Sequence, residues 1–172
     1  MEVSEAIKIR RSIRKYKDKE VPEELIKELL EAARLAPSAY NGQPWKFKVI
    51  NNKEVIKELK DNNVFKNEFV YTVPLIIVCC ADSEVYPERA EDNFNTRELA
   101  IGDVSIASQN IVLRATELGL GTCYVGLLSR EKIKKILNIP EKYIIPYVIT
   151  VGYADEKPNP TPRKSIEEIR SL

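Results

Sequence analysis

A short segment near the N-terminus combines side chains that bind anions. Residues 10–14, Arg-Arg-Ser-Ile-Arg, hold three arginines and a serine, and Lys15 and Lys17 follow. A guanidinium donates two parallel hydrogen bonds to phosphate oxygens, and a serine hydroxyl adds one directional donor. A solvated basic surface is the ordinary interpretation of such a cluster. Because lysine is the commoner basic residue elsewhere in the chain, the concentration of arginine favours a planar or phosphorylated anion.

A second segment, residues 36–45, places amide and hydroxyl side chains between two prolines. It reads Ala-Pro-Ser-Ala-Tyr-Asn-Gly-Gln-Pro-Trp. Proline, serine, asparagine and glycine are typical of turns, so a plain connection from a helix to a strand is one interpretation. The density of donors in so rigid a frame exceeds what a turn needs. Such a loop offers fixed hydrogen bonds to a flat heterocycle with carbonyl and imide edges.

The residue types that are missing or scarce exclude several reaction classes. The chain has no histidine, so it contains neither a Ser-His-Asp or Cys-His nucleophile nor a His-ligated metal site. Its cysteines, Cys79, Cys80 and Cys123, lie in apolar runs, and their odd number argues against a disulfide framework. We expect buried, unreactive thiols and no metal. An external cofactor therefore carries the chemistry of any enzyme built on this chain.

Length and charge narrow the class of protein further. The chain has 172 residues, 27 of them basic and 26 acidic, which predicts a single domain spanning 1–172 and no nucleic-acid partner. Its longest apolar run, residues 73–81, is too short to cross a bilayer. We find no secretory leader at the start of the sequence and expect a cytoplasmic protein that has no membrane partner.

The two polar segments lie next to stretches predicted to be helical, and these helices would position them. The helices are predicted from apolar residues that recur at helical spacing. Pro22 suits the first turn of the clearest helix, and Pro37 stops that helix. Gly119 ends the longest helix. Ile101, Ile106 and Leu113 fall outside the main apolar stripe of that long helix. The predicted helices are 4–9, 22–36, 53–60, 96–118 and 129–137, the last capped by Ser129, with a short terminal helix opened by the capping-box pair Ser165 and Glu168.

Strands alternate with these helices along the chain. Residues 45–50 alternate apolar and lysine side chains, as a half-exposed strand does, whereas 73–81 and 146–151 are typical of interior strands. Residues 121–127 form a short strand or extended loop, 83–95 a polar surface excursion, and 155–162 an extended tail. The pattern favours an α+β or α/β layered fold. So small a sheet leaves apolar helix faces uncovered, and a homodimer would cover them.

Taken together, the motifs resemble the nitroreductase family of FMN flavoproteins. The N-terminal Arg-Arg-Ser-x-Arg and the Ala-Pro-Ser-x-x-Asn-x-Gln-Pro-Trp that follows carry the resemblance. Residues 103–126 are similar to the family's long central helix and the flavin loop after it. Gly152-Tyr153 and Pro162-Arg163-Lys164 are similar to its last strand and closing basic residues. The matches cover about 7–164 in the family's order.

This resemblance implies an α+β fold with a small, mostly antiparallel sheet flanked by helices, in an interlocked homodimer that shares FMN across its interface. It implies that Arg14 lies near N1 and C2=O of the flavin. The FMN-binding residues it implies are Arg10, Arg11, Ser12, Arg14, Arg163 and Lys164 at the phosphate and pyrimidine edge; Pro37, Ser38, Ala39, Asn41 and Gln43 from the partner chain at the ring; and Val125, Gly126 and Leu127 near N5.

The implied reaction passes a hydride from NADH or NADPH through flavin N5 to a nitroaromatic, quinone or related small acceptor in a ping-pong order. No protein side chain is needed as a catalytic residue, and no metal is needed. Gly119-Leu120-Gly121 lacks the third glycine of a dinucleotide fingerprint, so the nicotinamide donor is expected to bind transiently over the flavin. The alternatives are a specialised relative, such as a deiodinase or flavin-fragmenting synthase, and a low-turnover flavin-binding or regulatory protein.

Overall fold

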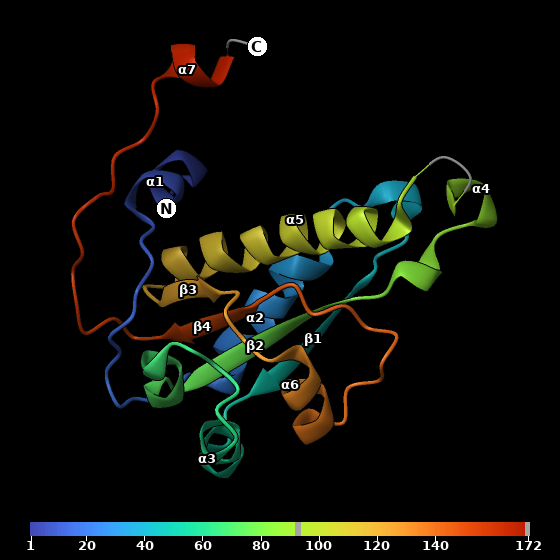
Figure 1. The fold of residues 1–172 in the computed structure, drawn as a ribbon. Coiled ribbons are helices and arrows are strands. Elements are labelled where there is room, and N and C mark those ends of the chain that lie inside the picture. Colours follow the sequence, from blue (N-terminus) through green and yellow to red (C-terminus); the bar gives the residue numbers. More distant parts are fainter. Residues whose placement is uncertain (92–93, 171–172) are drawn as a thin grey trace.

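A computed structural model describes residues 1–91 and 94–170 and has an α+β architecture (Figure 1). The strands are β1 Trp45–Ile50, β2 Leu75–Ala81, β3 Gly121–Val125 and β4 Val148–Gly152. The α-helices are α1 Val3–Ile9, α2 Glu23–Arg34, α3 Lys53–Asp61, α4 Glu88–Glu91, α5 Thr96–Glu117, α6 Arg130–Leu137 and α7 Ile166–Arg170. Short 3-10 helices are η1 Ala39–Asn41, η2 Glu68–Thr72 and η3 Ser83–Val85.

The four strands form one sheet in the order β1-β2-β4-β3, and each neighbouring pair is antiparallel. All residues of β2 and β4 are buried, which confirms the two interior strands expected from their β-branched, uncharged sequences. On β1 the exposed Lys46 and Lys48 alternate with less exposed apolar side chains. This confirms the half-exposed strand, which lies at an edge of the sheet.

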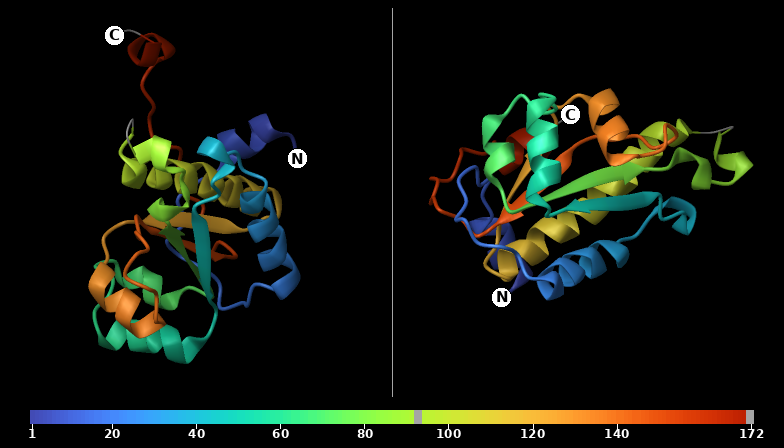
Figure 2. Two further views of the ribbon diagram at one scale, coloured as in Figure 1. Left: turned by 90° about the vertical axis from the view of Figure 1, so that its right-hand side faces the viewer. Right: turned by 90° about the horizontal axis from the view of Figure 1, so that it is seen from below.

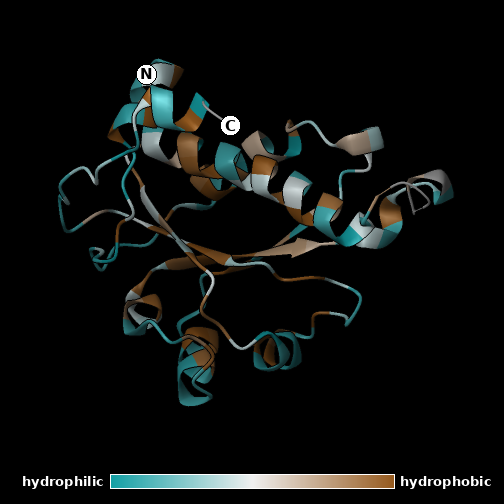
Figure 3. Ribbon diagram, turned by 45° about the horizontal axis from the view of Figure 1, so that its top comes forward, coloured by the Kyte–Doolittle hydropathy of each residue, from teal (hydrophilic) through white to brown (hydrophobic). Residues whose placement is uncertain are grey.

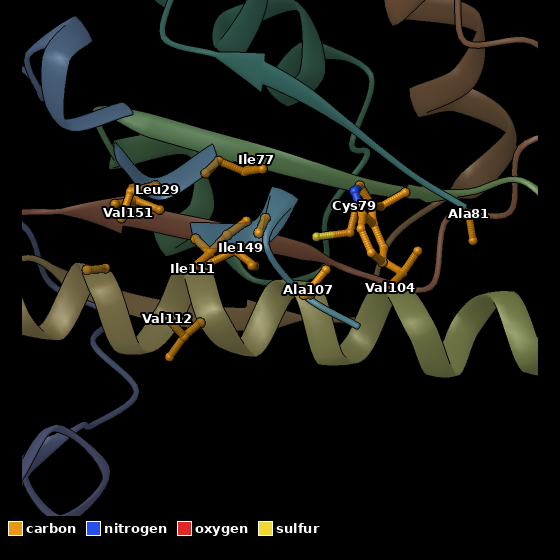
Figure 4. Packing of buried hydrophobic residues seen from close by; sticks show 14 of the residues in the cluster. Leu29, Ile77, Cys79, Ala81, Val104, Ala107, Ile111, Val112, Ile149 and Val151 are labelled. Atoms are coloured by element: carbon orange, nitrogen blue, oxygen red, sulfur yellow. The ribbon is translucent and has the colours of Figure 1, made fainter. Parts of the chain in front are cut away.

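Helices cover both faces of this sheet (Figure 2). Leu75, Ile77 and Cys79 point toward α2 and α5 and join one core cluster, whose packing Figure 4 shows. Ile76 and Cys80 point the opposite way and join a second cluster with α3 and α6. Adjacent side chains of a strand face opposite sides, so Cys79 and Cys80 cannot meet. All three cysteines are free and buried, as expected.

The longest helix, α5, packs against the sheet and against α2. The side chain of Asn95 caps it by accepting from the Arg97 and Glu98 amides at 3.2 and 3.4 Å. Gly119, just beyond its end, has φ +73°, the left-handed conformation that glycine adopts at helix C-termini. As expected, Ile106 lies off the buried face and is 45% exposed. Figure 3 shows hydrophobic and polar residues alternating along this helix.

Several predicted helix ends differ from the observed ones by one or two residues. The helix predicted over 22–36 ends at Arg34, with Pro22 at its N-cap. Ser129 occupies the N-cap position of α6, but its side chain makes no capping hydrogen bond. The capping box is confirmed: the Ser165 amide donates to Glu168 Oε2 at 2.8 Å, and the Glu168 amide donates to Ser165 Oγ at 3.2 Å.

Two segments extend from the layered body. The predicted polar excursion over 83–95 contains η3 and α4, and its residues 92–93 lie outside the described part. After β4, an extended arm leads past α1 to α7, which projects from the body on the side of α5 (Figures 1 and 2). On α7, Ile166 and Ile169 are exposed. Among the described helices, none combines the length and apolar character needed to cross a membrane.

Candidate functional site

The arginine segment lies beside strand β3. The Ile13 amide donates to the Thr122 carbonyl at 2.9 Å, and Ser12 forms a parallel bridge to the same residue. This close approach requires glycine at position 121, because a Cβ there would lie 2.7 Å from Ile13 Cγ1. The buried Ile13 side chain thus anchors the segment and leaves Arg10 on one side of the anchor and Arg14 on the other.

Arg10 is the basic side chain whose surroundings best suit an anionic ligand. It is half-buried and lines a cavity of about 230 Å³ with Thr116 and Gly119 from the end of α5. Within the described residues, its guanidinium has no hydrogen-bond or ion-pair partner. Because a half-buried charge without a partner is costly, the geometry favours an anionic ligand at Arg10.

The other members of the segment have partners or face solvent. The Arg11 guanidinium donates to the Lys8 and Arg10 carbonyls, both at 2.7 Å. Arg14 is exposed, and its amide donates to the Glu156 carboxylate. The pKa of the nearby Cys123 thiol is raised by burial, although Arg14, a hydrogen bond with Ser12 and Arg10 each oppose this shift. Burial thus leaves that thiol unreactive in spite of the positive field.

The loop at 37–45 has an unusual backbone. Three of its non-glycine residues, Tyr40, Asn41 and Gln43, have φ of 54°, 53° and 47°, in the left-handed region that such residues seldom adopt. The Gln43 amide donates to Ser38 Oγ at 3.0 Å. The Ala39 amide donates at 3.0 Å to a carboxylate of α5. A loop held in a disfavoured conformation by several contacts is typical of a ligand site.

That carboxylate belongs to Asp103, which interrupts the buried stripe of α5. Asp103 is 5% exposed, and its Oδ2 also accepts a hydrogen bond from the Tyr86 hydroxyl at 2.9 Å. Burial, together with a hydrogen bond to Asp103 and its negative charge, raises the pKa of Tyr86. The sequence analysis missed this residue. The signal was an acidic residue at a position where the helical spacing requires an apolar one.

Sequence reasoning also missed a cluster of hydroxyl groups beside Gly126. The buried Ser108 hydroxyl lies 2.8 Å from the Tyr147 hydroxyl and 3.1 Å from the Tyr124 hydroxyl. Burial raises the pKa of Tyr124, and the hydrogen bond with Ser108 partly opposes it. Both tyrosines and Gly126 line a cavity of about 440 Å³. The neighbouring Leu127 is 64% exposed, whereas Val125 is buried, and of these three residues Gly126 is the one that lines the cavity.

The two polar segments contact α5 at positions far apart along its length. The 37–45 loop meets this helix at Asp103, whereas Arg10 shares its cavity with Thr116 and Gly119. At a rise of 1.5 Å per residue, Asp103 and Thr116 are separated by about 20 Å along the axis. One chain therefore does not bring these segments together on one ligand.

The C-terminal basic residues lie on the arm between β4 and α7. Arg163 and Lys164 are exposed in the arm, and the Arg163 guanidinium donates to the Thr161 carbonyl and hydroxyl and to the Pro162 carbonyl. No three histidine, cysteine, aspartate or glutamate side chains gather as metal ligands in the ranges 1–91 and 94–170. An anionic organic cofactor fits the guanidinium, hydroxyl and backbone amide donors described above.

Comparisons with known proteins point to one family. The model of the nitroreductase family matches residues 7–64 and 60–153. A protein of Methanothermobacter thermautotrophicus, provisionally named NADH dehydrogenase/NAD(P)H nitroreductase, is 42% identical over 92% of this chain and 80% of its own length.

Solved structures agree with this match. A nitroreductase family protein from Clostridium difficile 630 superposes with a TM-score of 0.86 at 31% identity, covering 99% of this chain and 98% of the other. An FMN-dependent nitroreductase from the same species has a TM-score of 0.74 and 34% identity, with coverages of 95% and 92%.

Proposed function

The chain belongs to the nitroreductase family, and we propose that it is an FMN-dependent NAD(P)H oxidoreductase. Its substrates in this proposal are a nicotinamide donor and a small acceptor, either a nitroaromatic compound or a quinone. Support comes from the names of two similar proteins, one an NAD(P)H nitroreductase and the other an FMN-dependent nitroreductase. The observation that carries the proposal is the separation of the arginine segment and the 37–45 loop along α5.

A two-fold dimer resolves that separation. If two copies of α5 cross antiparallel at their midpoints, the 37–45 loop of one protomer approaches the arginine segment of the other. Because a two-fold interface is isologous, the same approach occurs a second time with the roles of the two protomers exchanged. Ile106 lies at the middle of α5 and is 45% exposed. A second copy would cover it.

The distribution of exposed apolar side chains supports the same interface. Within the described part of the chain, no large hydrophobic residue that is exposed lies on α3 or α6, which cover the other face of the sheet. Those exposed on α5, on or next to the helices packed against it, or on the arm include Ile106, Ile7, Leu35 and Ile166. Exposed apolar side chains that gather on one side of a protein are typical of an interaction site.

Within such a dimer, each part of the site has a distinct task. Arg10 offers its unpartnered guanidinium to the FMN phosphate, with Arg11 and Ser12 beside it and Arg163 and Lys164 supplied by the arm. The 37–45 loop of the partner, through its residues Pro37, Ser38, Ala39, Asn41 and Gln43, holds the edge of the ring. Backbone amides at Val125, Gly126 and Leu127 would lie near N5. Arg14 stabilises negative charge near N1 and C2=O.

Bound FMN supplies a reversible hydride carrier. The protein residues bind and orient the ring and keep one face accessible, and burial raises the pKa of Tyr124 and Tyr147 beside this site. Donor and acceptor occupy the open face in turn, which is the ping-pong order. No histidine or other general base takes part.

Two measurements on the purified dimer test this function. Mass spectrometry after acid release should identify FMN rather than FAD, and anaerobic addition of NADH or NADPH should bleach the flavin absorbance, which an acceptor then restores. Absence of any flavin after reconstitution with FMN contradicts the proposal. Bound flavin that neither nicotinamide reduces would instead indicate a flavin-binding protein without turnover.

A further inference from the structure

A buried carboxylate on α5 fixes the loop that the proposed function assigns to the flavin ring. A single oxygen of Asp103, Oδ2, accepts hydrogen bonds from the Ala39 amide at 3.0 Å and from the Tyr86 hydroxyl at 2.9 Å. Hydrogen bonds to an ionised acceptor are stronger than those between neutral groups. Asp103 therefore joins three segments that are distant in the sequence: the loop, η3 with its following residue, and α5.

The loop needs such a restraint because its backbone is disfavoured. Tyr40 and Asn41, which directly follow Ala39, both have positive φ. Residues other than glycine persist in this region only where surrounding contacts enforce it. The hydrogen bond to Ala39 lies at the start of the disfavoured stretch, so it holds the backbone where the chain turns into that conformation.

Tyr86 clamps the loop from a second direction. Its ring lies against Gly42, where an added Cβ would be 3.1 Å from Tyr86 Cε1. The same side chain donates its hydroxyl to Asp103. The loop is thus held at Ala39 by the carboxylate and at Gly42 by the tyrosine ring, on either side of Tyr40 and Asn41.

We propose that Asp103 is a positioning residue for flavin binding: it holds the 37–45 loop in the conformation that contacts the flavin ring bound to the arginine segment of the partner subunit. The inference rests on the proposed function. Asp103 itself touches neither the phosphate nor the ring in this account. Its effect reaches the flavin through Ala39 and the residues that follow.

The test compares FMN affinity and the visible circular dichroism of bound FMN in four dimeric variants. Asp103→Ala leaves two donors without an acceptor and should weaken FMN binding by about ten- to a hundredfold. It should also change the dichroism, because the loop contacts the ring. Asp103→Asn retains an oxygen that can accept both hydrogen bonds, though without the charge that strengthens them, and should give an affinity and spectrum between those of Asp103→Ala and the wild type. Tyr86→Phe removes one donor and should show a smaller effect.

Ile133→Ala is the control for a loss of stability alone. Ile133 is fully buried on α6, on the other side of the sheet, so this variant should be less stable yet bind FMN with the wild-type affinity and spectrum. Wild-type affinity and dichroism in Asp103→Ala would overturn the inference, as would Asp103→Asn being as impaired as Asp103→Ala. If Asp103→Ala does not fold, an unchanged spectrum in Tyr86→Phe overturns it. Failure of the wild-type protein to bind FMN would instead refute the proposed function on which the inference rests.

Discussion

Replacing Ile106 by glutamate should separate the dimer and release FMN together. Complete burial of an isoleucine contributes about 1.5–3 kcal/mol. Because Ile106 is 45% exposed in the isolated protomer, covering it contributes roughly 1 kcal/mol in each subunit. Ile106→Glu removes this contribution twice, since in the proposed two-fold dimer both copies of Ile106 lie at the crossing point.

The introduced charges add a larger penalty. Two carboxylates about 4 Å apart repel each other by roughly 4 kcal/mol at an effective dielectric constant of 20, and each also loses hydration. The dimer should therefore be weakened by at least about 6 kcal/mol, or roughly four powers of ten in its dissociation constant.

Gel filtration with light scattering and absorbance detection measures mass and flavin in one run. For Ile106→Glu we expect a monomer peak without flavin at a concentration where the wild type elutes as a yellow dimer. The matched control is Val55→Glu, which changes a half-buried β-branched residue of α3 on the other face of the sheet and should leave dimer and flavin intact. A monomer that retains stoichiometric FMN would refute the shared-site reasoning.

Three further predictions concern single groups. Arg10→Ala should raise the dissociation constant for FMN by about ten- to a hundredfold, because a charge-assisted hydrogen bond is lost; flavin fluorescence titration measures it, and unchanged affinity would place the phosphate elsewhere. Burial acts to raise the pKa of Asp82, but a hydrogen bond from Lys142 and other contacts lower this pKa overall. The ionised Asp82 therefore stabilises the fold at pH values above its unfolded pKa of about 4. This contribution is lost as the pH falls through the pKa of Asp82 in the folded state. Asp82→Asn should thus lower the free energy of unfolding at pH 7, measured by urea denaturation, and converge with the wild type in acid; a constant difference at all pH values would refute this. Burial raises the pKa values of all three cysteine thiols. A thiol reagent at pH 8 should therefore label the native protein slowly and the urea-unfolded protein rapidly. Rapid labelling of the native protein would contradict the burial of the thiols.

The strands and the helices follow largely from local patterns in the sequence, whereas the strand order does not. Uncharged stretches rich in β-branched residues identify β2 and β4 as interior strands, and alternation with lysine identifies β1 as a half-exposed strand. The capping box at Ser165 and Glu168 is also local, since both of its hydrogen bonds close within one helical turn. Such features depend on residues close in sequence, which is why they could be predicted.

The missed features depend on contacts between distant segments. Asp103 receives its two hydrogen bonds from residues 39 and 86, and Ser108 contacts residues 124 and 147. Nothing near either residue in the sequence indicates these partners. The left-handed conformation of Tyr40 is likewise imposed by the surrounding loop contacts rather than by its own preference. The separation of the arginine segment from the 37–45 loop depends on where each segment contacts α5, and no local sequence pattern specifies those contacts.

Subunit complementation tests the shared flavin site most directly. One protomer carries Arg10→Ala and the other carries Asn41→Ala with Gln43→Ala, and differently tagged copies are co-purified as a heterodimer. If each site takes its arginine segment from one subunit and its loop from the other, one site of the heterodimer is doubly altered and the other is wild type. The heterodimer should then bind one FMN per dimer with wild-type affinity, although neither altered homodimer does. Two equally weakened sites, with no tight FMN bound, would show that each flavin is held within a single chain and would contradict the account.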